Sequence, residues 1–235
     1  MNPLVSVMIG AYNAAPYLGE AIESALAQDY EPIQLLVVDD GSTDGTADVA
    51  RSFPQVKVIQ QENEGNGAAR NRAVEDASGE LYAFLDADDR FTPGKLSLQK
   101  AALDADPGLD MVFGHVREFL SPELDEQTRA SLRPPAPEPM PWTAPNLMLI
   151  RRESFQRVGP FTTAVRVGVT VDWFARAAEA GLRYTILPEV VLERRLHTQN
   201  NGLRERASRS QYLDVIRQAM ERRRAAAEAA QAEDT

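Results

Sequence analysis

The sequence predicts an α/β fold in which a mostly parallel sheet is flanked by helices. Short apolar runs alternate with amphipathic stretches through the first half of the 235-residue chain, as in β-α-β units. The run at 33–38 is apolar throughout, as expected of a parallel strand that is buried on both faces. Polar loops follow several of these runs, and ligands of such sheets bind outside the carboxyl ends of the strands.

The expected elements of the first half alternate regularly. Strands are expected at 5–9, 33–38, 56–59, 81–85, 111–113 and 116–120. Helices are expected at 16–28, from Thr43 or Asp44 to about 53, at 68–77 and at 93–104. The first helix has apolar residues at helical spacing and a proline in its first turn, where the missing N–H costs nothing.

The second half is less regular. Residues 121–145 hold seven prolines, which predicts a loop or an excursion between subdomains and neither a strand nor a helix. The expected elements after it are an apolar segment at 146–150, helices at 152–158 and 171–180, strands at 184–187 and 190–196, and an Ala/Arg/Glu-rich helix from about 207.

The composition is that of a soluble globular protein with an acidic body. Hydrophobic residues make up 43% and charged residues 26% of the chain, and the net charge of -10 argues against nucleic acid as a partner. The chain has no cysteine, which excludes a disulfide framework and a thiolate metal site. Because no signal peptide or membrane-spanning run is visible, we expect a cytoplasmic protein.

The charge is distributed unevenly. Positions 194–224 contain nine arginines and only three acidic residues. A solvated, Arg-rich helix is the favoured interpretation of this segment, and a peripheral contact with the inner face of an anionic membrane is the alternative.

Three carboxylates follow the expected strand at 81–85 within four positions, namely Asp86, Asp88 and Asp89. Like charges at close range repel, so such a cluster at the end of a buried strand is costly unless a cation lies beside it. Mg²⁺ and Mn²⁺ prefer oxygen ligands of this kind. The pattern therefore predicts a site for a metal and a diphosphate at this edge of the sheet.

Four segments of the first half share this polar character. They are Gly10-Ala11-Tyr12-Asn13, Asp39-Asp40-Gly41-Ser42, Asn63-Glu64-Gly65 with Ala69-Arg70-Asn71, and Asp86-Ala87-Asp88-Asp89. In this order and spacing they resemble the family 2 glycosyltransferases, whose fold is the Rossmann-like GT-A fold, over roughly residues 4–200. The resemblance implies a GT-A domain at 1–203, with a donor half at 1–114 and a smaller acceptor half at 115–203, followed by a C-terminal helix at 204–235.

The resemblance also assigns residues to a nucleotide-diphosphate sugar, usually a UDP-sugar. The residues so assigned are Ala11, Tyr12, Asn13, Asp40, Asn66, Gly67, Arg70 and Asp86. Asp40 would accept a hydrogen bond from the base, and Asp86 would lie near the ribose. Asp88, the second acid of an Asp-X-Asp motif, and His197 would hold Mn²⁺ or Mg²⁺, which suits carboxylate and imidazole ligands.

Each assignment has a structural alternative. The acids at 39–40 could cap a helix, Asn66 and Gly67 could form a turn, and the strand-end acids could be solvated. Arg70 and His197 could lie on the surface.

The acceptor half departs from the resemblance at one place. Family members often carry a Glu-Asp pair before an Asp-X-Trp-like helix start, and the Asp of the pair is the usual base. Here Val169 and Thr170 occupy these positions ahead of Asp172 and Trp173. A general base contributes roughly 10²–10⁴-fold to rate. Either Asp172 serves as the base, or the pair has been lost, or the register is shifted by two; Asp172 could equally be a helix cap.

Three functions follow from these observations. The first is an inverting, metal-dependent sugar transfer to a glycan, a lipid-linked acceptor or a small molecule. The second is a degenerate family member that binds a nucleotide sugar without efficient transfer and acts as an interaction module. A nucleotidyltransferase is disfavoured because the segment Gly10-Ala11-Tyr12-Asn13 lacks a Gly-rich loop that bears Arg or Lys.

Overall fold

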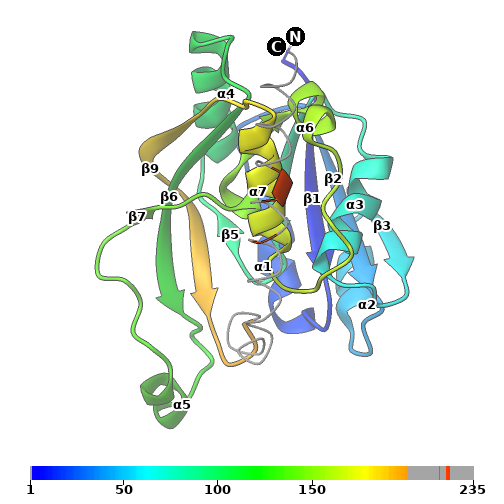
Figure 1. The fold of residues 1–235 in the computed structure, drawn as a ribbon. Coiled ribbons are helices and arrows are strands. Elements are labelled where there is room, and N and C mark those ends of the chain that lie inside the picture. The colour runs from blue at the N-terminus through cyan, green and yellow to red at the C-terminus, as the bar shows by residue number, and fades with distance from the viewer. Residues whose placement is uncertain (1, 201–216, 218–220, 223–235) are drawn as a thin grey trace, which may run out of the picture.

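The structure, a computed structural model, describes residues 2–200, 217 and 221–222. Within these residues, nine strands form one sheet: β1 (Val5–Ala11), β2 (Ile33–Asp40), β3 (Val56–Gln61), β4 (Leu81–Asp86), β5 (Arg90–Phe91), β6 (Met111–Leu120), β7 (Met140–Pro141), β8 (Leu149–Arg151) and β9 (Tyr184–Leu196). Their order is β3-β2-β1-β4-β8-β6-β9-β5, with β7 beside β6 (Figure 1). β3, β2, β1 and β4 are parallel to one another. β8 lies between β4 and β6 and is antiparallel to both.

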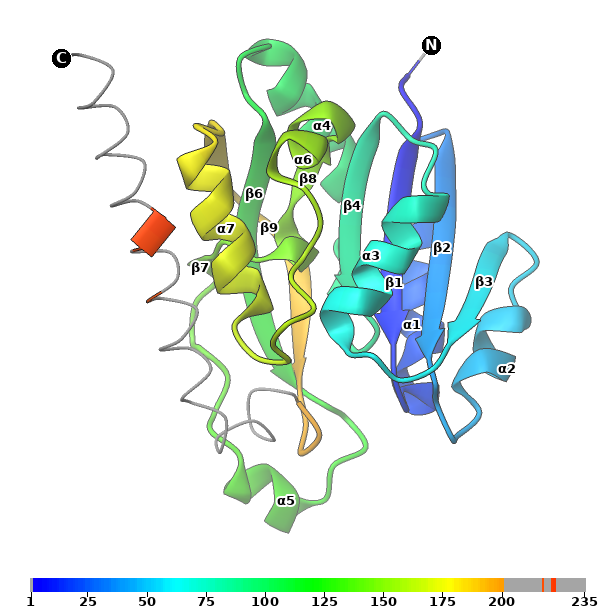
Figure 2. The ribbon, with the colours of Figure 1, turned by 45° about the vertical axis from the view of Figure 1, so that its right-hand side comes forward.

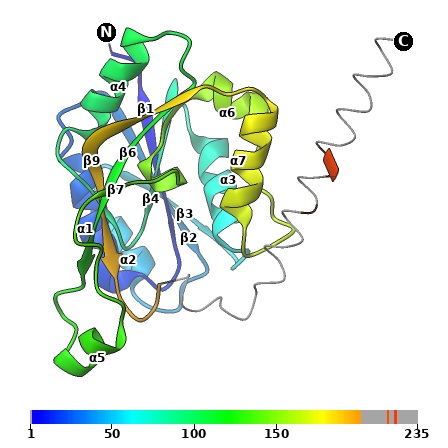
Figure 3. The same cartoon turned by 60° about the vertical axis from the view of Figure 1, so that its left-hand side comes forward.

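Helices cover both faces of the sheet. They are α1 (Ala15–Leu26), α2 (Thr46–Arg51), α3 (Asn66–Asp76), α4 (Lys95–Ala105), α5 (Glu126–Ser131), the 3₁₀ helix η1 (Pro145–Leu147), α6 (Arg152–Val158) and α7 (Val169–Glu179). Figures 2 and 3 show α3, α6 and α7 on one face of the sheet and α1 and α4 on the other. This is the α/β arrangement that the alternating pattern predicts.

The core confirms the apolar patterns of the sequence. Leu18, Ala21, Ile22 and Ala25 of α1 are fully buried, and six successive residues at the end of β2 are buried. A strand buried on both faces cannot alternate polar and apolar residues, which explains why β2 is uniformly apolar up to its terminal aspartates.

Three sequence expectations are corrected by the structure. The proline-rich segment contains one short helix, α5, which Asp125 caps by accepting a hydrogen bond from the Thr128 N–H. It also contains one short strand, β7, which pairs with β6. The two strands expected at 111–120 are one strand, β6, with irregular pairing around Gly114. The two expected at 184–196 are likewise one strand, β9.

The C-terminal helix expected at 204–235 lies outside the described residues apart from positions 217, 221 and 222. Among the described residues, no helix is both long and apolar enough to cross a bilayer.

A buried lysine ties α4 to η1. Lys95 is 1% exposed, and its Nζ donates to Gln99 Oε1 at 2.6 Å and to the Leu147 carbonyl at 3.2 Å. Gln99 in turn donates to the same carbonyl at 2.7 Å. Burial lowers the pKa of Lys95 from 10.5 to about 7, because the charged form is disfavoured away from water.

This lysine makes stability depend on pH. Between about pH 7 and 10.5 the unfolded chain holds a proton that the folded chain has released, so the free energy of unfolding rises with pH. We expect a rise of about 1.4 kcal/mol per pH unit from this group, measured by urea denaturation below pH 10. Lys95→Met should flatten the rise, whereas Lys57→Met, at a half-exposed side chain, should not. An unchanged slope in Lys95→Met would contradict the assignment.

Candidate active site

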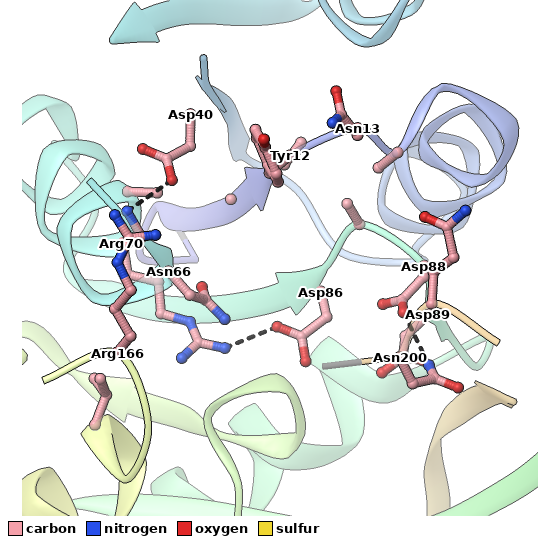
Figure 4. Close-up of a pocket in the computed structure, with 18 of the residues that line it drawn as sticks. Tyr12, Asn13, Asp40, Asn66, Arg70, Asp86, Asp88, Asp89, Arg166 and Asn200 are labelled. Atoms are coloured by element: carbon pink, nitrogen blue, oxygen red, sulfur yellow. Dashed lines mark hydrogen bonds and ion pairs between the residues drawn. The ribbon is translucent and has the colours of Figure 1, made fainter. Parts of the chain in front are cut away.

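A cavity of about 500 Å³ lies at the carboxyl ends of β1, β2 and β4 (Figure 4). The polar segments that follow these strands form one wall, and the segment from Arg166 to α7 forms another. Of the predicted site residues, those that line the cavity are Ala11, Tyr12, Asn13, Asp40, Asn66, Arg70, Asp86, Asp88 and His197. Gly67 and Asp172 do not line it.

Tyr12 and Asn13 follow β1 at the mouth of the cavity. Tyr12 is 46% exposed, and Asn13 adopts a positive φ of 49°, which asparagine tolerates better than most residues. The Asn13 Oδ1 accepts the Thr43 N–H at 2.9 Å, and the Asn13 N–H donates to Ser42 Oγ at 2.9 Å. These bonds fix the loops after β1 and β2 against each other and leave the Tyr12 ring open to a ligand.

Asp40 anchors the loop that leads into α3. Its carboxylate accepts hydrogen bonds from Gln61 Nε2 at 2.7 Å and from the N–H groups of Glu64 and Gly65 at 3.0 and 2.8 Å. An ionised carboxylate offers about four acceptor positions. One position is left for a ligand, so the predicted hydrogen bond to a base stays a prediction that the geometry permits.

Arg70 and Asp86 form an ion pair across the floor of the cavity. Arg70 is 6% exposed, and its Nη2 lies 2.7 Å from Asp86 Oδ1, which rules out the surface alternative for this arginine. The second oxygen of Asp86 accepts from Asn146 Nδ2 at 3.0 Å. Figure 4 shows Arg70 directed at Asp86, with Asp88 and Asn200 on the far side of the floor.

The sequence pattern did not single out Asn146. Its Nδ2 lies 3.0 Å from Asp86 Oδ2 and 2.9 Å from Asp89 Oδ2, so one amide group links two acids of the cluster. The available signal was a single polar residue at the start of an otherwise apolar run, directly after Pro145.

Asp89 is the buried member of the acid cluster. It is 3% exposed, and its Oδ1 accepts the Arg195 N–H at 3.0 Å. Burial, and then the nearby charges of Asp88 and Asp86, raise the pKa of Asp89 well above its usual range.

Asp88 and His197 meet at the side of the cavity. His197 Nε2 lies 2.9 Å from Asp88 Oδ2, and Asn200 Nδ2 lies 3.2 Å from the same oxygen. His197 is 4% exposed, which rules out the surface alternative.

The pair fits a divalent ion. Two ligand atoms at right angles, each about 2.1 Å from an octahedral ion, are about 3 Å apart. The described residues hold no cluster of three or more His, Cys, Asp or Glu side chains fit to bind a metal. Mg²⁺ is commonly held by one or two protein ligands together with substrate phosphates, so two are sufficient.

Arg195 supports this pair from behind. It is 1% exposed, and its Nε donates to the Asp88 carbonyl at 3.0 Å while its Nη2 lies 2.7 Å from Glu20 Oε2. Its Nη1 donates to Ser121 Oγ at 3.1 Å. The sequence pattern indicated only that arginines precede His197, and not that this one is buried.

The N-terminus of α7 brings Val169 and Thr170 to the cavity wall. Asp172 is 6% exposed and is not among the residues that line the cavity; its Oδ2 lies 2.9 Å from Arg176 Nε, and its Oδ1 lies 3.3 Å from Arg222 Nη2. The structure therefore does not bring Asp172 together with the other predicted site residues, and its role as a base stays a prediction.

Gly67 is needed for close packing at the start of α3. A Cβ atom there would lie 2.7 Å from the Thr162 carbonyl oxygen and 3.2 Å from Val169 Cγ1. Only glycine allows the segment before α7 to lie this close to α3. Gly67 thus shapes the wall beside the cavity, whereas contact with a ligand stays a prediction.

Comparisons with known proteins agree with the fold. The sequence matches the model of Glycosyl transferase family 2 over residues 6–166. It is 32% identical over 204 residues to Glycosyltransferase AglE of Haloferax volcanii, which covers 80% of this chain and 66% of AglE. It is 30% identical over 219 residues to an uncharacterized glycosyltransferase of Rickettsia felis, covering 85% of this chain and 35% of that protein.

Two solved structures share the fold. TarS of S. aureus in complex with UDP-GlcNAc has a TM-score of 0.74 at 20% identity, covering 92% of this chain and 65% of TarS 1-349. The mannosyltransferase PcManGT of Pyrobaculum calidifontis in complex with GDP-Man and Mn²⁺ has a TM-score of 0.70 at 24% identity, covering 94% and 65%. The chain spans about two thirds or less of each of these four proteins. Because the family model covers more than half of its length, the chain belongs to glycosyltransferase family 2.

Proposed function

We propose that this chain transfers a sugar from a nucleotide-diphosphate sugar to an acceptor with inversion at the anomeric carbon, and that UDP-sugars are the first donors to test. The observation that carries the proposal is the convergence of Asp40, Arg70, Asp86, Asp88 and His197 on one cavity at the carboxyl ends of parallel strands. Such edges are where nucleotides bind in open α/β sheets. AglE is named a glycosyltransferase, and the structures of TarS and PcManGT contain UDP-GlcNAc and GDP-Man respectively, which supports a nucleotide-sugar donor.

The side chains of the cavity suit a departing diphosphate. Negative charge grows on the leaving oxygen as the sugar is transferred, and fixed positive groups lower the barrier by stabilising it. Asp88 and His197 would hold a divalent ion, Mn²⁺ or Mg²⁺, which supplies such charge without proton transfer. Arg70 keeps Asp86 in place, so that its carboxylate is ready to accept from a ribose hydroxyl.

A thermal-shift screen tests the proposal. UDP-, GDP- and dTDP-sugars are added with and without Mn²⁺, and the matching donor should stabilise the fold by about 2.7 kcal/mol at a hundredfold excess over its Kd. Release of the nucleoside diphosphate then reports turnover. Absence of stabilisation by every donor would contradict nucleotide-sugar binding, and full turnover in excess EDTA would contradict the role of the metal.

A second candidate is a protein that binds the nucleotide sugar without efficient transfer. It is favoured by the wall of α7, where Val169 and Thr170 replace ionisable residues, and by the burial of Asp172 outside the cavity lining. Val169→Glu together with Thr170→Asp would restore the acidic pair. A large gain in turnover in this double variant would show that the lost base limits the native chain.

Asp172→Asn tests the remaining base candidate. We expect transfer to fall less than tenfold, because the carboxylate is held by Arg176 and Arg222 away from the cavity lining. Loss of 10²–10⁴-fold, with donor affinity unchanged, would instead identify Asp172 as the general base. Glu179→Gln, which also removes a partner of Arg222, serves as the matched control.

The acceptor, a cytoplasmic location and a membrane contact of the Arg-rich segment at 204–235 are also proposals. Sedimentation with anionic and with neutral vesicles tests the contact, since a basic segment binds only the former.

A further inference from the structure

The proline-rich segment presents an exposed aromatic ring. Trp142 follows β7 and is 38% exposed. The other tryptophan of the chain, Trp173, is fully buried, stacks on Phe155 at 5.4 Å between ring centroids, and donates its indole N–H to the Gly159 carbonyl. Core packing therefore accounts for Trp173, and it leaves Trp142 unexplained.

Trp142 packs on Arg194, and Arg194 is one of the residues that line the cavity. The Arg194 Cζ is 5.0 Å from the centroid of the Trp142 ring. The guanidinium of Arg194 also forms an ion pair with Glu118, whose side chain is 2% exposed and whose Oε1 lies 2.9 Å from Arg194 Nη1. An arginine held by a carboxylate and an aromatic face loses little further freedom when a ligand binds.

Glu118 is a firm anchor for this arginine. Its Oε2 accepts from Arg133 Nη1 at 2.7 Å and from the Ala136 N–H at 3.1 Å. The hydrogen bond from Arg133 is the main reason that the pKa of Glu118 is lowered to about 2. Glu118 is therefore ionised at neutral pH, and Arg133 and Ala136, from the same segment as Trp142, are bound to it.

The ring is also tied to the acid cluster by a short piece of chain. Asn146, which donates to Asp86 and Asp89, follows Trp142 by four residues. Four residues span at most about 14 Å, so this is the largest separation of the Trp142 and Asn146 Cα atoms.

We propose that Trp142 and Arg194 form a subsite that binds a sugar ring of the acceptor. The apolar C–H face of a pyranose would pack on the indole face that Arg194 leaves open, and Arg194, bound to Glu118, would hold the ring in position from the opposite face. The acceptor class is thus a saccharide, whether free or carried on a lipid. This inference rests on the proposed function, because a sugar bound here is an acceptor only if the chain transfers a sugar.

Fluorescence tests the subsite without relying on turnover. Methyl glycosides of glucose, mannose, galactose, N-acetylglucosamine and glucuronic acid are titrated in the presence of Mn²⁺ and of the nucleoside diphosphate that stabilises the protein most. We expect at least one to shift the emission of Trp142 and to protect it from acrylamide. Trp142→Phe leaves only buried Trp173, and the response should vanish in it. No response to any glycoside, or an equal response in the variant, would overturn the proposal.

Kinetics give the second measurement. In Trp142→Ala the KM for the glycoside that binds should rise about tenfold, as expected for loss of one stacked ring, while the stabilisation by the donor stays unchanged. Trp142→Phe should recover most of the loss. An unchanged acceptor KM in Trp142→Ala overturns the subsite alone. If no nucleotide sugar stabilises the native chain, the proposed function itself is overturned. An octyl glycoside of the same sugar separates a lipid-linked from a free acceptor, because only the former gains from the alkyl chain.

Discussion

Asp88→Asn is expected to lower the rate of sugar transfer by about 10²–10³-fold and to leave the fold intact. The Asp88 carboxylate lies 2.9 Å from His197 Nε2, and the pair is the candidate site for a divalent ion in the cavity. Loss of one group that stabilises developing charge costs about this much in kcat. The Asp88 side chain is 26% exposed, and an asparagine there has the same size and keeps an oxygen that can accept a hydrogen bond.

The measurement is nucleoside diphosphate release at saturating donor and a range of Mn²⁺ concentrations. Asp104→Asn removes a carboxylate that is 62% exposed, lies on α4 and pairs with Lys100 among the described residues, so it should behave as the native chain. Equal rates for the Asp88 and Asp104 variants would show that Asp88 has no part in transfer.

Arg195→Met should destabilise the fold by about 3 kcal/mol and also reduce transfer. The guanidinium is 1% exposed and binds Glu20, the Asp88 carbonyl and Ser121. Breaking a buried charged contact costs about 3–5 kcal/mol. The lower value applies because Glu20 is 42% exposed and regains water when its partner is removed.

Denaturation by urea measures the stability, and transfer is assayed at a temperature at which the variant remains folded. Arg195→Lys should recover only part of both losses, because an ammonium cannot replace the planar fork of donors. Arg51→Met, at a side chain that is 51% exposed, is the control and should change stability by less than about 0.5 kcal/mol. A fully active and stable Arg195→Met would show that the network behind Asp88 does not hold it in place.

The sequence predicted the parallel half of the fold because its strands are buried on both faces. In the other half of the sheet, two strands contain a residue that is typical of strand ends. Gly114 lies at an irregularity within β6, and Pro188 lies within β9, so the pattern predicts two strands where the structure has one. The short helix α5 depends on one capping aspartate inside a proline-rich stretch, which composition alone conceals.

The site was predictable where it depends on strand ends, because parallel strands bring Asp40 and Asp86 to the same edge. It was not predictable where it depends on contacts between distant positions. Arg195 binds Glu20 from 175 residues away, and Asn146 binds Asp86 from 60 residues away. Asp172 has the expected place on a helix, but the direction of its side chain follows from Arg176 and Arg222.

The amide of Asn146 has a thermodynamic consequence. It contacts the acid cluster through Asp86 and Asp89, and it belongs to the same short stretch as Trp142. A ligand that orders this stretch lowers the cost of ordering it for a second ligand. Should the proposed donor and acceptor both order this stretch, each would strengthen the other's binding by one common factor, which two titrations in opposite order would measure.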